Sequence, residues 1–176
     1  MLNRFSISQL ARLLGFATLV IMALMVLGIV YFFIDVEAGR AVLLRDAPEI
    51  AGSSVLSSGT IRSMLIVGLA SVAVQIYLLW QAHILFGLYA RRSFLSRDSA
   101  HTIRNLGLGL LFLPVVRFVQ EPIWSILMTM NREDISLSIG ISSDGIGYLI
   151  GGVLMLLIGL AMVEATQAAE ENRGFV

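Results

Sequence analysis

Four long apolar runs limit this chain to one class of fold. Three of them, residues 13–34, 63–90 and 145–163, contain no Asp, Glu, Lys or Arg. A helix needs about 20 apolar residues to cross the ~30 Å hydrocarbon core of a bilayer, and each run meets that requirement. The runs therefore predict membrane-spanning helices rather than the core of a soluble domain.

The third run in chain order, 105–131, is apolar but defective as a membrane span. It holds Arg117 and Glu121 in its middle, beside Pro114 and Pro122. Its Leu, Ile, Phe and Val residues favour insertion by roughly 4 to 8 kcal/mol, whereas two central charges oppose it by about 5 to 7 kcal/mol. The two contributions nearly cancel, so we expect this span to insert only with help from its neighbours.

The runs predict one all-α membrane domain over residues 1–176, a four-transmembrane-helix bundle with a possible short β element in its outer loops. Spans are expected at about 13–34, 63–90, 105–131 and 145–163. An even number of spans places both termini on one side of the membrane. More Arg residues fall in the terminal and 91–104 segments than in the other two loops, which by the positive-inside rule predicts cytoplasmic termini in a bacterial inner membrane.

The loops carry two local signals. Ser96 followed by Asp98 is typical of a helix start, because a serine side chain caps free N–H groups and an acidic residue complements the helix dipole. We expect that helix to run through Arg104 into the third span. Residues 135–142 alternate apolar and small polar side chains, which indicates a short strand. Residues 41–44 are its natural partner, and a lone strand resting on the bundle is the alternative.

Arg117 and Glu121 stand four residues apart, on one face of a helix. They can form an internal ion pair, and Gln75 of the antiparallel second span can add a hydrogen bond. One interpretation is a polar site for an ion, a proton or a small ligand, since charges inside a membrane mark functional sites. A second is a structural pair that fixes helix register. A third ends the helix at Glu121, with residues 123–130 lying along the interface.

Two further sets of residues suggest contacts between helices or with other proteins. Gly147 and Gly151 form a GxxxG motif, which lets helices approach closely within the bundle or in a homodimer. A cytoplasmic contact surface is expected where the basic inner loop meets the acidic C-terminal segment, with Arg97 and Arg104 pairing with glutamates. Its members are Arg91, Arg92, Arg97, Arg104, Glu170 and Glu171.

The composition argues against most enzymatic and cofactor chemistry. The chain has no Cys, two His and no carboxylate cluster near either His, so thiol chemistry and a zinc site lack their residues. The net charge is zero, which gives no footprint for direct nucleic-acid binding. We therefore expect no catalytic residue, no metal and no cofactor. The expected partner is the lipid bilayer, and the sequence does not indicate an oligomeric state.

Several segments carry a resemblance to a known family. They read LFGLY at 85–89, FLSRDSA at 94–100, IRNLG at 103–107 and EENRGFV at 170–176. The chain resembles over most of its length the bacterial membrane-protein family catalogued as domain of unknown function 2975. Arg91-Arg92-Ser93 stands where family members tend to place a Gly. The resemblance implies four helices in a membrane and a regulatory partnership with a cytoplasmic protein.

The leading expectation is thus a non-enzymatic sensor or regulatory partner that acts through protein contacts. The alternative is a subunit of a transport system for an ion or small molecule, which would use Arg117 and Glu121. Four spans are few for a lone carrier, so that role would require an oligomer or a partner.

Overall fold

The computed structural model describes residues 4–46, 57–129 and 143–173, and almost all of these residues are helical. The helices are α1 (Arg4–Ile34), α2 (Val36–Asp46), α4 (Ser58–Ala90), α5 (Arg97–Thr129) and α6 (Ser143–Arg173). Four of them, α1, α4, α5 and α6, are long and apolar enough to cross a membrane. The predicted all-α fold is therefore confirmed, and the chain is a multi-pass membrane protein.

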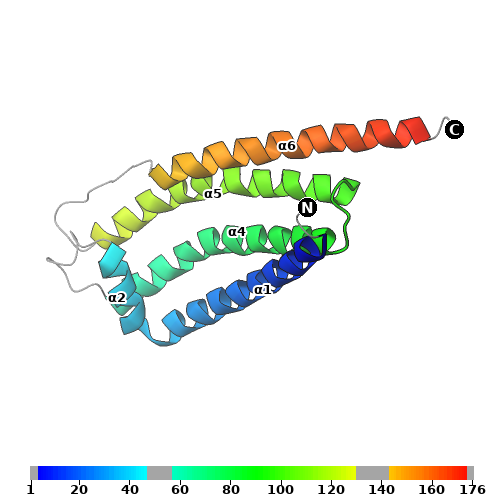
Figure 1. Ribbon diagram of the computed structural model, residues 1–176. Helices are drawn as coiled ribbons and strands as arrows, with labels where there is room; N and C mark the ends of the chain where they lie inside the picture. Colours follow the sequence, from blue (N-terminus) through cyan, green and yellow to red (C-terminus); the bar gives the residue numbers. More distant parts are fainter. Residues whose placement is uncertain (1–3, 47–56, 130–142, 174–176) are drawn as a thin grey trace.

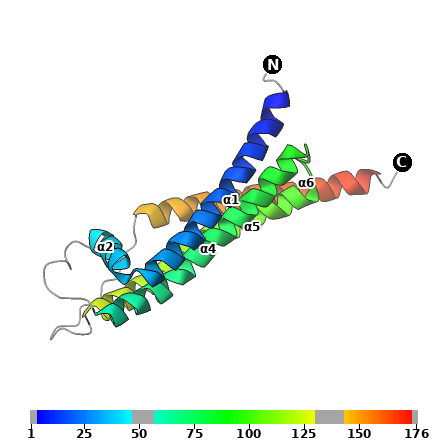
Figure 2. The same cartoon turned by 90° about the horizontal axis from the view of Figure 1, so that it is seen from below.

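The four long helices pack in chain order, α1 against α4, α4 against α5 and α5 against α6. Figure 1 shows this row, with α1 and α6 at its two sides, and Figure 2 shows α6 inclined to the other spans. The short helix α2 contacts α1 and α4 at one end of the row, called here the α2 end. The start of α1 and the end of α6 lie at the opposite, terminal end (Figure 1).

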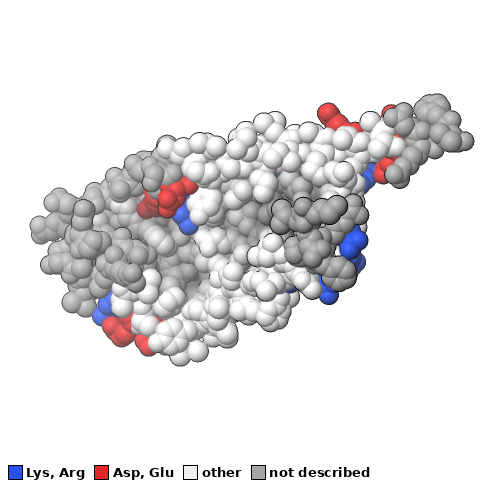
Figure 3. Space-filling model, in the orientation of Figure 1, with Lys and Arg blue, Asp and Glu red and all other residues white. Residues whose placement is uncertain are grey.

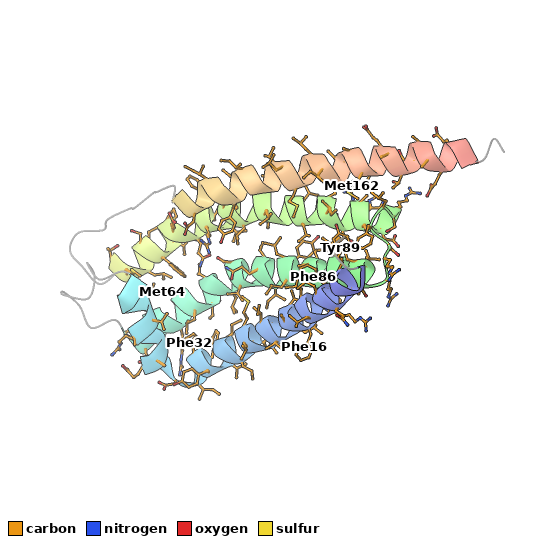
Figure 4. All side chains as sticks on the ribbon, in the orientation of Figure 1. Phe16, Phe32, Met64, Phe86, Tyr89 and Met162 are labelled. Carbon is orange, nitrogen blue, oxygen red and sulfur yellow. The ribbon has the colours of Figure 1, made fainter. Side chains whose placement is uncertain are left out.

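The surface of the row is largely uncharged, as contact with lipid requires. Charged atoms gather at its two ends in Figure 3, apart from one group beside the start of α6. Large apolar side chains such as Phe16, Leu24 and Leu157 are exposed. A small core of Leu85, Ile103 and Leu106 joins α4 to α5. Figure 4 labels two residues packed on that core, Tyr89 and Met162, toward the terminal end.

The turn between α4 and α5 confirms the predicted helix start. Ser96 Oγ accepts a hydrogen bond from the Ser99 backbone N–H at 3.2 Å, and α5 begins at Arg97 with Asp98 in its first turn. The preceding helix ends in a Schellman motif. The N–H groups of Arg92 and Ser93 donate to the carbonyl oxygens of Tyr89 and Leu88, both at 3.0 Å. Such a motif needs a left-handed residue, and Arg92 supplies it with φ 62°.

Arg92→Gly should stabilise the protein by about 1 kcal/mol, because a left-handed conformation strains every residue that has a Cβ atom. The gain is measured as a rise in the thermal unfolding midpoint of the detergent-solubilised protein. Arg91→Gly is the matched control, since Arg91 has φ −87° and gains nothing from glycine. An equal rise for both variants would contradict the explanation.

Several expectations about local structure are wrong. Residues 41–44 belong to α2 and are helical, so they offer no strand partner; the strand expected at 135–142 lies outside the described residues. The helix α5 continues through Pro114 and Pro122 to Thr129, which excludes a helix end at Glu121. A proline inside a helix removes one backbone donor and usually bends the helix, but neighbouring spans on both sides hold α5 in place.

Close packing of α6 on α5 uses glycines other than those expected. A Cβ atom on Gly159 would lie 2.5 Å from the backbone N of Arg104, and one on Gly152 would lie 2.8 Å from Leu111 Cγ. In contrast, a Cβ atom on Gly147 or Gly151 would meet nothing within 4 Å in the described parts of the chain. The prediction that Gly147 and Gly151 pack inside the bundle is therefore wrong. They lie on another face of α6.

Candidate functional site: a polar cavity between α1, α4 and α5

The register of the helices fixes the depth of Arg117. Gly159 lies against Arg104 and Gly152 against Leu111, so α6 runs antiparallel to α5 and begins beside residues that follow Arg117. The Arg117 guanidinium accordingly lies over the ring of Tyr148, 5.6 Å from its centroid. Although Arg117 is central in its apolar run, it lies in the half of the bundle that ends at α2.

The three residues predicted to form a polar site line one cavity. Gln75 of α4 and both Arg117 and Glu121 of α5 border a space of about 570 Å³ between α1, α4 and α5. Ser71, Gln120 and Trp124 also line it. The remaining lining residues are apolar or glycine: Met25, Gly28, Ile29, Phe32, Phe33, Met64, Leu65, Gly68, Leu69 and Val72. Phe32 and Met64 lie toward the α2 end in Figure 4.

The helix order explains why the cavity forms here. Both α1 and α5 pack extensively against α4, whereas extensive contacts join only helices that are consecutive in the row. A space therefore stays between α1 and α5, with α4 as its floor. On the floor, Gly68 leaves room for the indole ring of Trp124, which would lie 3.5 Å from a Cβ atom at that position.

Two polar contacts hold α5 on α4 beside the cavity. The Ser71 hydroxyl donates a hydrogen bond to Oε1 of Gln120, and both side chains are buried. The Trp124 indole N–H donates to the Met64 backbone oxygen at 3.1 Å. Because lipid offers no competing partner, hydrogen bonds between spans stabilise helix association, typically by about 0.6 kcal/mol each. These contacts fix the wall that carries Arg117 and Glu121.

The expected ion pair between Arg117 and Glu121 is absent from the structure. Across the described residues, oppositely charged groups come within 4.0 Å of each other at Arg40 and Glu37 of α2, 3.1 Å apart, and not at Arg117 and Glu121. Arg117 instead makes its cation–π contact with Tyr148 of α6. A guanidinium over an aromatic face is stabilised by the ring quadrupole, and this contact draws Arg117 toward α6. The self-neutralising pair that the spacing suggested is therefore wrong as a description of this conformation.

Sequence reasoning missed Ser71, Gln120 and Tyr148 as parts of this site. Ser71 is four residues before Gln75, and Gln120 is three residues after Arg117, so helical periodicity places each near a predicted site residue. That signal was available. Tyr148 was interpretable only as a member of the aromatic belt at the membrane interface, because its contact with Arg117 depends on how α6 rotates against α5.

The expected cytoplasmic contact surface lies at the terminal end, but its members do not pair. Arg91, Arg92 and Arg97 are exposed, as are Glu170 and Glu171, and no ion pair joins these groups in the part of the chain that the structure describes. Arg104 lies against Gly159, about three helical turns from Glu170. The end of α6 extends past the start of α5, which keeps the acidic and basic groups apart.

Comparisons with known proteins give no relative. The chain matches no family model, no curated protein and no solved structure. The resemblance to the family of unknown function 2975 therefore stays a prediction, and the cavity and the charged surfaces are the features from which a function can be inferred.

Proposed function

We propose that this chain is a non-enzymatic sensor of the bacterial inner membrane, which binds an amphiphilic molecule in the cavity between α1, α4 and α5. The observation that carries the proposal is the convergence of Gln75, Arg117 and Glu121 on a cavity whose other walls are largely apolar. Ligand sites in proteins combine such walls with a few polar groups, in volumes of about 300 to 1,000 Å³. An amphiphile fits such a site, because its polar head can bind the polar groups while its apolar part packs on the apolar walls.

The charged groups at the terminal end support a regulatory output. Arg91, Arg92 and Arg97 are exposed at the same end of the bundle as Glu170 and Glu171, which lie on the projecting end of α6. Basic loops favour the cytoplasmic side of a membrane, so we assign this end to the cytoplasm. A soluble partner with complementary charges could then contact both segments. A change in helix packing on ligand binding would be transmitted to this charged end through α4 and α5, because these helices line the cavity and are joined by the basic turn.

Binding can be followed from inside the cavity, because Trp124 lines it and the chain has only one other tryptophan. In a Trp80→Phe background, an amphiphile with a brominated chain should quench Trp124 emission saturably. Gly28→Leu should weaken this binding about tenfold, since overfilling a site costs about 1 to 3 kcal/mol. Gly28 lines the cavity, and a Cβ atom there meets nothing within 4 Å.

Gly87→Leu is the matched control for the cavity-filling variant. Gly87 lies on a membrane helix and, like Gly28, has nothing within 4 Å of its Cβ position, but it does not border the cavity. Its substitution should leave Trp124 quenching unchanged. Non-saturable quenching that Gly28→Leu does not alter would overturn the proposal of a ligand site.

A further inference from the structure

The polar residues of the cavity stand at successive depths. Trp124 contacts Met64, Gln120 contacts Ser71, and Gly109 packs on Leu78. This antiparallel register places Gln75 of α4 deeper than Ser71, toward the middle of the bundle. Glu121 is one turn nearer the α2 end than Arg117, about 6 Å along the helix axis. From the α2 end inward, the order is a carboxylate, then a guanidinium, then a neutral amide.

Among the described residues, neither charge has an ion-pair partner within 4.0 Å. Arg117 is half-buried, and its guanidinium carbon lies over the ring of Tyr148. A cation–π contact uses none of the N–H groups as hydrogen-bond donors to an oxygen, so they can bind other acceptors. Glu121 is also half-buried, and no hydrogen bond or ion pair engages its carboxylate within the described ranges. A charge at membrane depth is costly without a partner. A molecule that pairs with both must carry an anion and a cation.

We infer that the cavity binds the head group of a zwitterionic phospholipid with a primary ammonium, such as phosphatidylethanolamine, from the leaflet at the α2 end. This rests on the proposed ligand site. Such a lipid presents its ammonium outermost, then its phosphate, then its ester carbonyls, then its chains. That order matches Glu121, Arg117 and Gln75, followed by the apolar wall of α1.

The same groups discriminate between lipid classes. Glu121 accepts hydrogen bonds from a primary ammonium, but a quaternary ammonium such as that of phosphatidylcholine has no N–H to donate. An anionic lipid such as phosphatidylglycerol satisfies Arg117 and leaves Glu121 unpaired beside a negative charge. Each of these head groups loses one charge-assisted hydrogen bond, which corresponds to about a tenfold loss of affinity.

The test uses the full chain with Trp80→Phe in vesicles of phosphatidylcholine that contain a minor fraction of brominated lipid. The brominated lipid carries an ethanolamine, choline or glycerol head on identical chains. Trp124 should be quenched with about tenfold higher apparent affinity by the ethanolamine lipid. In a Trp124→Phe chain, Trp80, which is half-exposed outside the cavity, should be quenched equally by all three lipids.

Charge-neutral variants assign the two contacts. Glu121→Gln should remove the preference for ethanolamine over choline, and Arg117→Gln should weaken both. Glu164→Gln, an exposed glutamate of α6 outside the cavity, should change nothing. Soluble phosphoethanolamine tests the source of the head group. Full competition by this compound would overturn the assignment to a membrane lipid.

Two negative outcomes have different meanings. Saturable quenching that Gly28→Leu weakens, but with equal affinity for the three head groups, would overturn the zwitterion inference and leave the proposed ligand site standing. Quenching of Trp124 that is neither saturable nor sensitive to Gly28→Leu would overturn both.

Discussion

Gly159→Ala should destabilise the protein by about 1 to 3 kcal/mol, the cost of overpacking a tight interface. The added methyl group would lie 2.5 Å from the backbone N and 2.7 Å from Cα of Arg104. Neither atom can move aside by rotating a side chain, so α5 and α6 must separate. Alanine is a better helix former than glycine by up to about 1 kcal/mol, which offsets only part of the loss. The measurement is thermal unfolding in detergent, followed by circular dichroism.

Gly147→Ala on the same helix is the control. It brings the same gain in helix propensity, but its methyl group meets nothing within 4 Å. We expect this variant to be neutral or slightly stabilised. Equal destabilisation by the two substitutions would mean that glycine content, rather than contact with Arg104, determines the stability of α6.

The two glycine substitutions also show what sequence could and could not predict about the fold. The number of spans follows from apolar length alone, and the structure has four helices long and apolar enough to cross a membrane. The face that each span turns inward does not follow. Gly147 and Gly151 share one face of a helix, and Gly152 and Gly159, two turns apart, share another. The choice between these faces depends on α5, where a Cβ atom on Gly107 would lie 2.8 Å from Cα of Leu156 in α6.

The candidate site was partly predictable for a similar reason. Arg117 and Glu121 were conspicuous because charges are costly in a membrane, and Gln75 followed from the antiparallel order of the spans. The cavity itself was not predictable, since it exists because α1 and α5 lie on the same floor without extensive mutual contact. The absent ion pair has a comparable cause. Spacing on one helix indicated Glu121 as the partner of Arg117, but the guanidinium lies instead over the ring of Tyr148, on another helix.

A double substitution of Arg117→Leu and Glu121→Leu should convert the third span from a marginal to a fully inserting segment. The native residues 105–129, placed in a host protein with glycosylation sites on both flanks, should insert in about half of the molecules, since the apolar gain nearly equals the cost of two charges. Replacement of both charges should lower the apparent free energy of insertion by about 5 to 7 kcal/mol. Each single substitution should contribute about half of this change.

Residues 145–163 serve as the positive control, because this segment of α6 has no charged residue and should insert fully in its native form. Complete insertion of native 105–129 would mean that the charges reach the interface in the isolated segment, as snorkelling would allow. In the complete chain α4 and α6 pack on either side of α5, and they provide the polar contacts that the isolated segment lacks. The double variant should therefore fold in the full protein while losing the preference of the cavity for a zwitterionic head group. Retention of a charged, marginal span is then explained by binding rather than by stability.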